Sequence, residues 1–340
     1  MDLQLAGKRA LITGSTSGIG AEIARMLALE GVKVVVHGRD RARAEKVVAD
    51  IEAKGGNASV ALGDLMTPDG TDAVIKATEQ TSRGVDILVN NAGGSGSATA
   101  PGWFETPVEE WTESYRQNTV PAVRLASAFV PAMRQRGWGR VIQISWRNAI
   151  SPYAQFGPYG AAKAALNNLT LSLSKALAGT GVTCNGIMPG LIYTPLAEPW
   201  FKALAKQLGS DDPKIGRDFA LKSVLNQTVA RIGQPCDIAA AVCFIASPLS
   251  DFMTGTTLRT AAPHPRSDSG RGGHLDRKYR EPIGNPTGSL IFSELILQDY
   301  SNISTVRATS PAFIARNASL TSSSLPRRVI MPSRSSRPCW

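Results

Sequence analysis

The chain has 340 residues, 43% of them hydrophobic, and a formal net charge of +10. This length is enough for one large domain or two ordinary domains with a buried core. No run approaches the roughly 18 consecutive apolar residues of a membrane span, and the first residues lack a basic segment followed by an apolar one. We therefore expect no membrane span and no signal peptide, and we interpret the protein as cytoplasmic.

The positive charge is concentrated at the end of the chain. Residues 261–340 hold 11 lysines and arginines against 5 acidic residues, whereas residues 1–260 hold 26 against 22. Because basic and acidic residues nearly balance over 1–260, the charge of this part of the chain does not indicate nucleic-acid binding. Because the four cysteines and three histidines are scattered without metal-ligand spacing, no metal site is predicted.

Strands and helices are predicted to alternate up to about residue 259. The first unit is an apolar strand at 9–12, a glycine-rich segment at 13–20 and a helix at 21–30. Further strands are expected at 33–37, 58–62, 85–89, 140–144, 182–187 and 256–259. Helices are expected at 40–54, 71–82, 108–136 (one long helix), 158–178 and 236–246, with an irregular flap at 195–225. The alternation predicts a doubly wound α/β domain whose parallel sheet is covered on both faces.

The composition changes at residue 260. Residues 261–340 contain 14 serines, 8 prolines and 10 arginines but only one lysine. Such a segment buries too little apolar surface to offset the entropy of ordering it. We therefore predict a single domain at 1–259 followed by a disordered tail at 260–340. Two interpretations of the tail are left open, a basic arm and a translated out-of-frame extension.

The glycine-rich segment reads Thr-Gly-Ser-Thr-Ser-Gly-Ile-Gly over residues 13–20. Glycines let the backbone turn sharply and approach a ligand closely, and the free N–H groups at the start of a helix face an anion. Between a strand and a helix, this pattern predicts a site for the phosphates of a dinucleotide. The predicted contacts are Gly14, Ser15, Thr16, Ser17, Gly18, Ile19 and Gly20.

Over residues 5–259 the chain resembles the short-chain dehydrogenase/reductase family, particularly its members similar to 3-oxoacyl-[acyl-carrier-protein] reductase. The motifs that carry the resemblance are the glycine turn, Asp64, Asn90-Asn91-Ala92-Gly93, Asn118, Tyr159-Gly160-Ala161-Ala162-Lys163, and Pro189-Gly190 with Thr194. The resemblance implies a Rossmann fold, a nicotinamide cofactor and hydride transfer between that cofactor and a carbonyl compound or secondary alcohol.

Tyr159 and Lys163 are four residues apart and therefore lie on one face of a helix. An ammonium near a phenol favours the phenolate and lowers the tyrosine pKa toward the working range. Tyr159 is thus predicted to be the general acid for a carbonyl oxygen, or the base in reverse. The resemblance implies that Lys163 also holds the nicotinamide ribose. It further implies that Asn118, inside the long helix, holds a water that relays protons to Lys163.

The choice of cofactor is read at the end of the second strand. NAD-specific enzymes place an acidic residue there, but this chain has Gly38 followed by Arg39. A guanidinium suits a 2′-phosphate, so NADP(H) is favoured. By resemblance, Asp64 accepts a hydrogen bond from the adenine and Thr194 binds the carboxamide. The remaining predicted cofactor contacts are Leu65, Asn90, Ala92, Gly93, Tyr159, Pro189, Gly190 and Ile192.

The active-site motif departs from the family at one position. The family places its catalytic serine 13 residues before the tyrosine, and here that residue is Trp146. Ser145 comes one residue early, and adjacent side chains on a strand point to opposite faces. Losing one donor to the developing alkoxide costs about 10²–10³ in rate. A one-residue shift that restores Ser145, and a donor at Asn148 or Ser151, are left open. Ser145 is therefore kept as a catalytic candidate beside Tyr159, Lys163 and Asn118.

The end of the domain departs as well. The family closes its last strand with a Val-Asp-Gly-Gly-like segment, often at a subunit interface, whereas this chain reads Leu-Arg-Thr-Ala-Ala-Pro over residues 258–263. We therefore expect a frayed last strand. The homo-oligomer that the resemblance implies is put in doubt.

These observations favour NADP(H)-dependent reduction of a small carbonyl compound, including 3-oxoacyl thioesters. An alternative is an NADP(H)-binding protein with little or no turnover, because Trp146 stands in the serine position. A third possibility, an S-adenosylmethionine-dependent transferase, is opposed by the Tyr159/Lys163 pair and by Arg39. The aromatic residues that could form the lip of an apolar pocket are Trp103, Phe104, Trp200 and Phe201.

Overall fold

The computed structural model describes residues 1–82, 84–94, 103–152, 154–195, 197–221, 229 and 231–260, all within one compact unit. In this part of the chain, seven strands form one parallel sheet in the order β3-β2-β1-β4-β5-β6-β7. They are β1 (Arg9–Ile12), β2 (Lys33–Gly38), β3 (Asn57–Leu62), β4 (Ile87–Asn90), β5 (Gly139–Ile144), β6 (Val182–Met188) and β7 (Thr257–Arg259). The predicted doubly wound Rossmann fold is confirmed. The predicted tail at 260–340 lies outside the described residues except for Thr260.

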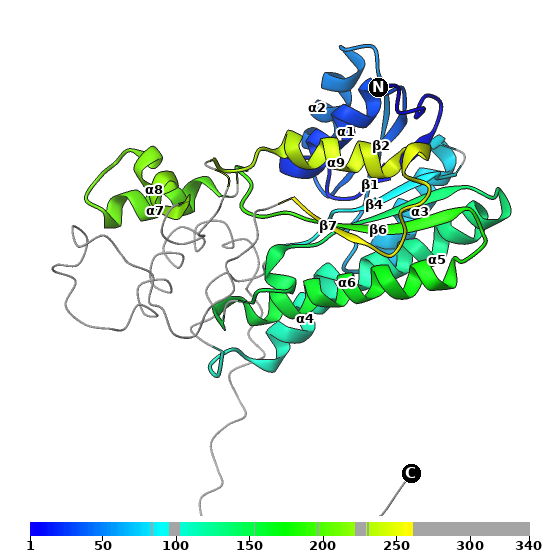
Figure 1. Ribbon diagram of the computed structural model, residues 1–340. Helices are drawn as coiled ribbons and strands as arrows, with labels where there is room; N and C mark the ends of the chain where they lie inside the picture. The colour runs from blue at the N-terminus through cyan, green and yellow to red at the C-terminus, as the bar shows by residue number, and fades with distance from the viewer. Residues whose placement is uncertain are drawn as a thin grey trace, which may run out of the picture. The chain divides into compact units, whose positions relative to one another are not determined.

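Helices cover both faces of this sheet (Figure 1). The helices are α1 (Gly18–Leu29), α2 (Arg41–Glu52), α3 (Pro68–Ser82), α4 (Val108–Asn118), α5 (Val120–Gln135), α6 (Gly157–Ala176), α7 (Glu198–Gln207), α8 (Pro213–Phe219) and α9 (Pro235–Ala246). One layer contains α1, α2 and α9, and the other contains α3, α5 and α6, with α4 packed against α6. The inner strands β1, β2 and β4 are buried almost throughout, which explains their apolar runs, whereas the edge strands β3 and β7 are mostly half-buried.

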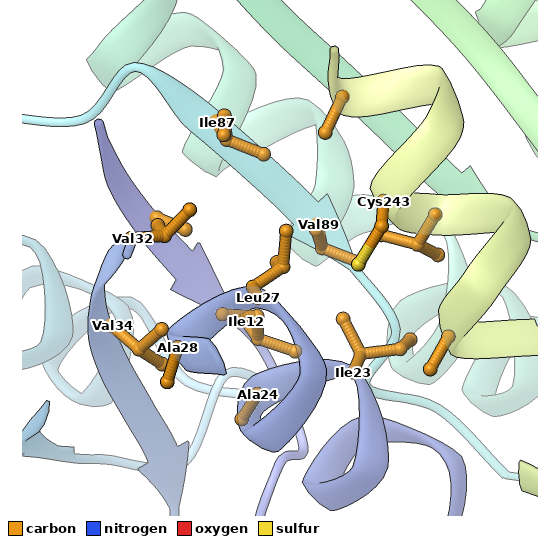
Figure 2. Packing of buried hydrophobic residues seen from close by; sticks show 14 of the residues in the cluster. Ile12, Ile23, Ala24, Leu27, Ala28, Val32, Val34, Ile87, Val89 and Cys243 are labelled. Atoms are coloured by element: carbon orange, nitrogen blue, oxygen red, sulfur yellow. The ribbon is translucent and has the colours of Figure 1, made fainter. Parts of the chain in front are cut away.

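The layer formed by α1 and α9 has the larger apolar core. Ile23 and Leu27 of α1 meet Cys243 of α9 above Ile12 and Val89 of the two central strands (Figure 2). All five side chains are buried. This packing anchors α1, so its first turn is held at the carboxyl end of β1.

The predicted long helix at 108–136 is wrong, because the structure has two helices separated at Thr119. Pro121 follows in the first turn of α5 and has no N–H to continue the hydrogen-bond ladder of α4. The hydroxyl of Thr119 instead donates to the Ala162 carbonyl oxygen of α6 at 3.0 Å. As a consequence, Asn118 ends α4 rather than lying inside a helix.

The predicted irregular flap at 195–225 also needs correction, because it contains α7 and α8. Each helix has a proline in its first turn, Pro199 or Pro213, where the missing N–H is not needed. The Asp212 carboxylate caps α8 by accepting from the Lys214 amide at 2.8 Å. A small apolar cluster around Phe201 joins the two helices.

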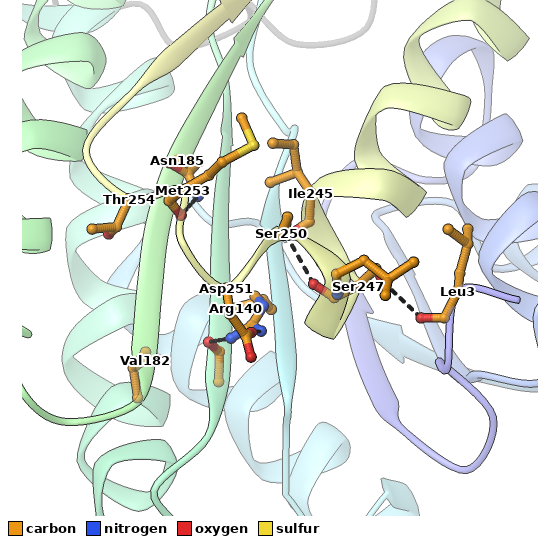
Figure 3. A network of polar contacts seen from close by, with 12 residues as sticks. Leu3, Arg140, Val182, Asn185, Ile245, Ser247, Ser250, Asp251, Met253 and Thr254 are labelled. Atoms are coloured by element: carbon orange, nitrogen blue, oxygen red, sulfur yellow. Dashed lines mark hydrogen bonds and ion pairs between the residues drawn. The ribbon is translucent and has the colours of Figure 1, made fainter. Parts of the chain in front are cut away.

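The segment between α9 and β7 is tied to the rest of the domain by polar contacts (Figure 3). The Asn185 amide of β6 donates to the Met253 carbonyl oxygen at 2.7 Å, and Arg140 of β5 pairs with Asp251. The hydroxyl of Ser247 donates to the Leu3 carbonyl oxygen at 2.8 Å. These contacts support β7, which is short but pairs with β6 over all three residues. The last strand is therefore formed rather than frayed.

The strand order reverses between β1 and β4, which neighbour each other at the centre of the sheet. The chain leaves β1 toward one helical layer and leaves β4 toward the other. In open parallel sheets, ligands bind beyond the carboxyl ends of the strands at this reversal point. Most of the predicted site residues lie at or follow the ends of β1 to β6, and thus meet at this edge.

Candidate cofactor site and active site

The glycine turn makes a narrow bend between β1 and α1. Gly14 and Gly18 have φ angles of +63° and +55°, a region that favours glycine. A Cβ atom on Gly20 would lie 2.5 Å from the Gly14 carbonyl oxygen, so only glycine lets the turn close. The hydroxyl of Ser17 does not cap α1, whose first amide groups have no helical carbonyl to bind. The bend thus presents main-chain donors, as an anion site requires.

Two residues that the sequence analysis did not select hold this turn in place. The Thr13 hydroxyl accepts from the main-chain amides of Asn91 and Ala92, both at 2.9 Å. The Asn91 side chain donates to the carbonyl oxygens of Thr13 at 2.8 Å and Gly14 at 3.2 Å. The predicted Asn90 is instead buried in the sheet, where its side-chain amide has no hydrogen-bond partner among the described residues. The Asn-Asn-Ala-Gly motif at 90–93 indicated that an asparagine lies near the cofactor site. It did not indicate that Asn91, rather than Asn90, bonds the glycine turn.

His37, at the end of β2, is the third residue that sequence reasoning missed. Its Nδ1 accepts from the Gly14 amide at 2.9 Å, and its Nε2 lies 3.2 Å from the Gly63 carbonyl oxygen. Its main-chain amide donates to the Ser15 hydroxyl, and the Ser15 amide donates to the His37 carbonyl oxygen, both at 2.9 Å. The predicted Ser15 is therefore buried, with its hydroxyl and its amide both bonded inside the protein.

Gly38 and Arg39 lie beside the predicted adenosine contacts. A Cβ atom on Gly38 would collide with the methyl group of Thr16. The Arg39 guanidinium is exposed and lies 3.9 Å from the Asp64 carboxylate. Asp64 also accepts from the Met66 amide at 3.1 Å, and Leu65 between them is buried. The predicted residues from the ends of β2 and β3 are thus brought together, with a cation at the surface.

Tyr159 and Lys163 lie in the first turns of α6, as predicted. The Lys163 Nζ is 5.6 Å from the centroid of the Tyr159 ring and donates to the Ile144 carbonyl oxygen at 2.9 Å. Burial lowers the pKa of Lys163 to about 8. Burial also raises the pKa of Tyr159 above its ordinary value. The expected lowering of the Tyr159 pKa is therefore not found, because desolvation dominates and the ammonium is directed to a carbonyl oxygen.

Asn118 and Lys163 flank Gly93, after the end of β4. The Asn118 side chain accepts from the Gly94 amide at 3.1 Å and donates to the Gly94 carbonyl oxygen at 2.8 Å. A Cβ atom on Gly93 would collide with Asn118 and would lie 3.3 Å from the Lys163 Nζ. Only glycine fits between them. The structure thus brings Asn118, Gly93 and Lys163 together, as the resemblance implied.

Trp146, and not Ser145, packs against Tyr159. The centroids of the two rings are 4.9 Å apart with 35° between their planes, and the edge of Phe156 meets the indole at 5.6 Å. The buried Ser145 hydroxyl donates to the main-chain carbonyl oxygen of Lys163 at 3.2 Å. The side chains of Ser145 and Trp146 thus contact different groups, as expected for adjacent residues at the end of a strand. Asn148 is buried, and its side chain donates to the Phe156 carbonyl oxygen at 3.4 Å.

The segment after β6, from Pro189 to Thr194, also reaches the glycine turn and the residues after β5. The Pro189 carbonyl oxygen accepts from the Arg147 amide at 3.1 Å, and Ile192 is buried against Gly233. The Thr194 methyl group is 3.6 Å from the Cβ position of Gly18, so this segment reaches the glycine turn. Gly190, between Pro189 and Ile192, is buried.

The four aromatic residues proposed for a pocket lip divide into two groups. Trp103 is about half exposed and packs on Trp111, whereas Phe104 is 90% exposed. Phe201 is fully buried and contacts Trp200. Phe201 therefore belongs to the core of the α7–α8 region rather than to a lip.

Two further features are absent from the described part of the chain. No helix there combines the length and hydropathy that a membrane crossing requires. Over the same residues, no group of three or more histidine, cysteine or acidic side chains is placed to hold a metal ion.

Comparisons with known proteins agree with this arrangement. The short chain dehydrogenase family matches residues 8–205. The 3-oxoacyl-[acyl-carrier-protein] reductase FabG of Vibrio cholerae is 34% identical over 257 residues, covering 75% of this chain and 96% of that protein. The structure of L-sorbose reductase from Gluconobacter frateurii, complexed with NADPH and L-sorbose, has a TM-score of 0.71 at 33% identity and covers 76% of this chain and 97% of that chain.

A 7α-hydroxysteroid dehydrogenase complexed with NADH and 7-oxo glycochenodeoxycholic acid has a TM-score of 0.67 at 32% identity, covering 76% of this chain and 94% of that one. The similarity thus extends along nearly the whole length of each of these proteins. Because the family match spans more than half of the chain, and relatives above 30% identity align along three quarters of it, the protein belongs to the short-chain dehydrogenase family of oxidoreductases.

Proposed function

We propose that the protein is an NADP(H)-dependent reductase of small carbonyl compounds, with Tyr159 as the proton donor. The observation that carries this proposal is the position of Lys163. Its ammonium is buried beside the Tyr159 ring and adjoins Gly93 at the carboxyl edge of the sheet. Burying an ammonium lowers the stability of the fold, so a buried lysine that faces a tyrosine at this edge indicates a catalytic role rather than a stabilising one.

The residues present fit a nicotinamide dinucleotide. The glycine turn presents main-chain amides to its phosphates, and Asp64 with Leu65 borders the adenosine side. Lys163 would hold the nicotinamide ribose, and Thr194 would hold the carboxamide. When bound, the reduced cofactor supplies the hydride. Membership of the family and the NADPH-bound sorbose reductase support this cofactor class.

The preference for NADP(H) rests on Gly38 and Arg39. Gly38, at the end of β2, has no carboxylate to receive the ribose hydroxyls, and the collision with Thr16 keeps the position small. The nearby Asp40 carboxylate caps α2 by accepting from the Arg43 amide. The exposed Arg39 guanidinium matches a 2′-phosphate in charge and in fork geometry. The related steroid dehydrogenase is complexed with NADH, so the residues of this chain, rather than its family, carry the argument.

The proton chemistry follows from burial. Because the pKa of Tyr159 is raised, its hydroxyl is protonated at neutral pH and can donate to a carbonyl oxygen as hydride arrives. Lys163, with a pKa lowered to about 8, can change charge near neutral pH. It can thus return a proton to Tyr159, with Asn118 beside it to orient a relaying water.

A second candidate function is cofactor binding with little turnover. The observation that favours it is the indole of Trp146 against Tyr159. By resemblance, Trp146 stands where the family has a serine hydroxyl, and its ring packs directly against the ring of the proposed proton donor. Loss of one preorganised donor raises the barrier by roughly 3–4 kcal/mol. Cofactor binding depends on other residues and should be retained.

One experiment separates the two functions. NADPH oxidation is measured against 3-oxoacyl thioesters, simple ketones and quinones, while NADPH and NADH binding are followed by fluorescence titration. Binding with turnover near the common enzyme value of about 10 s⁻¹ supports the reductase. Tight NADPH binding with weak turnover on every substrate supports the second function. A protein that binds neither nucleotide contradicts both.

A further inference from the structure

His37 joins three segments that surround the proposed adenosine site. Its ring bonds Gly14 in the β1–α1 turn through Nδ1 and reaches the Gly63 carbonyl oxygen after β3 through Nε2. Its own main chain exchanges two hydrogen bonds with Ser15. Gly63 directly precedes Asp64, the proposed adenine contact. One imidazole thus fixes the spacing between the phosphate-binding turn and the adenine side of the site.

The hydrogen bonds determine the protonation state of the ring. Gly14 can only donate through its amide, so Nδ1 must carry a lone pair. The single proton is then on Nε2, which donates to the Gly63 carbonyl oxygen. The ring is 4% exposed, and burial lowers the pKa of His37 to about 4. The charged groups that face it are Asp64, which favours protonation, and Arg39, which opposes it.

We propose that His37 is a positioning residue that sets the affinity for the adenosine half of the cofactor, and that it acts as the neutral Nε2–H tautomer. This inference rests on the proposed cofactor function. Without the ring, the Gly14 amide loses its acceptor and the imidazole link between the turn and Gly63 after β3 is lost. A second proton, on Nδ1, would direct two N–H groups at each other and open the same contact.

Three variants separate the two bonds of the ring. In His37→Asn, the side-chain oxygen occupies the position of Nδ1 and can accept from Gly14, whereas His37→Leu has the same branching and accepts nothing. In His37→Gln, the terminal amide can still donate to Gly63. Binding of NADP⁺ and of 2′,5′-ADP, the adenosine half alone, is measured by calorimetry at pH 7.5. Circular dichroism and thermal melting without nucleotide verify folding.

We expect His37→Leu to weaken NADP⁺ and 2′,5′-ADP by the same factor, at least tenfold. His37→Asn should stay within about threefold of the parent, and His37→Gln should fall between them. Such rescue by an acceptor at one position is not expected of a residue that only fills space. A folded Leu variant that binds both nucleotides like the parent overturns the inference and leaves the proposed function intact. A parent protein that binds neither overturns both.

The tautomer has a direct readout. His37 is the only histidine before residue 261, so its ring signals are identified by their loss in His37→Asn. At pH 6, the ¹⁵N chemical shifts should show an unprotonated Nδ1 and a protonated Nε2, although an exposed histidine is mostly charged there. A charged ring, or a proton on Nδ1, contradicts the inference whatever the binding data show.

Discussion

The indole of Trp146 lies against the phenol ring of Tyr159, with 4.9 Å between the centroids and 35° between the planes. Ser145, one residue earlier, directs its hydroxyl to the main chain of α6 instead. A bulky aromatic side chain therefore packs on the proposed proton donor, at the position where the resemblance implies a small hydroxyl. This contact distinguishes the two candidate functions. It involves the proposed proton donor, whereas the glycine turn, Arg39 and Asp64 of the proposed cofactor site are other residues.

Replacing Trp146 with serine should raise the rate of carbonyl reduction at least tenfold. The change restores a donor to the developing alkoxide, which is worth roughly 10²–10³ in rate, and it removes the indole. Steady-state NADPH oxidation measures the effect, and NADPH affinity should be unchanged. Trp146→Phe serves as the matched control, since it supplies no hydroxyl. Trp146→Ser combined with Tyr159→Phe should show no gain.

An ordinary rate in the parent protein, with no effect of Trp146→Ser, would contradict this prediction. Another donor must then fill the serine's role. Asn148, which is buried and lies two residues after Trp146 in the chain, would be the first residue to replace.

NADPH should bind more tightly than NADH, and Arg39→Asp should reverse that order. The guanidinium is exposed and can turn from Asp64 to a 2′-phosphate, whereas an aspartate repels the phosphate and accepts from a ribose hydroxyl. Fluorescence titration of both cofactors measures the ratio. Arg41→Asp, on the exposed start of α2, is the control and should leave the order unchanged. Equal affinities in the parent protein would contradict the proposed preference.

An acidic residue at position 38 should fail to create NADH preference by itself. A Cβ atom there collides with the Thr16 methyl group, so Gly38→Asp must displace part of the glycine turn. We expect it to weaken both cofactors and to lower the melting temperature. Adding Thr16→Ser removes the methyl group and should restore NADH binding. If Gly38→Asp alone binds NADH well, Thr16 does not restrict the position.

The pH dependence of stability should differ between the parent and His37→Asn. The pKa of His37 is about 4 in the folded state, against about 6.5 for an unfolded histidine. Between these values the unfolded chain binds more protons, so stability is fully present above pH 6.5 and falls as the pH drops toward 4. The total change is about 3 kcal/mol.

Urea unfolding at several pH values between 4.5 and 7.5 measures this difference. Carboxylates titrate alike in both proteins, so the gap between the two curves isolates the imidazole. The parent should lose stability more steeply than His37→Asn on acidification. Parallel curves would show that His37 titrates normally in the folded state.

Much of the fold could be predicted from the sequence because its determinants are local. The apolar run at 9–12, the glycines after it and the helical spacing of Ile23 and Leu27 involve neighbours in the chain. The same holds for Tyr159 and Lys163, whose shared helix face follows from their separation. The register of Trp146 against Tyr159 was likewise a count along the chain, and the structure brings the two rings together.

The remaining features depend on contacts between segments that the sequence does not order. His37 bonds Gly14 across 23 residues, and Asn91 bonds Thr13 across 78, so both contacts exist only once β1 lies between β2 and β4. The helix break at Thr119 is stabilised by a bond to Ala162 in another helix. The Tyr159 pKa moved opposite to the local expectation, because burial by the surrounding fold outweighs a lysine on the same helix. Residue types and spacings thus determined which chemistry the chain carries, whereas the strand order and burial decided which side chains meet and in what protonation state.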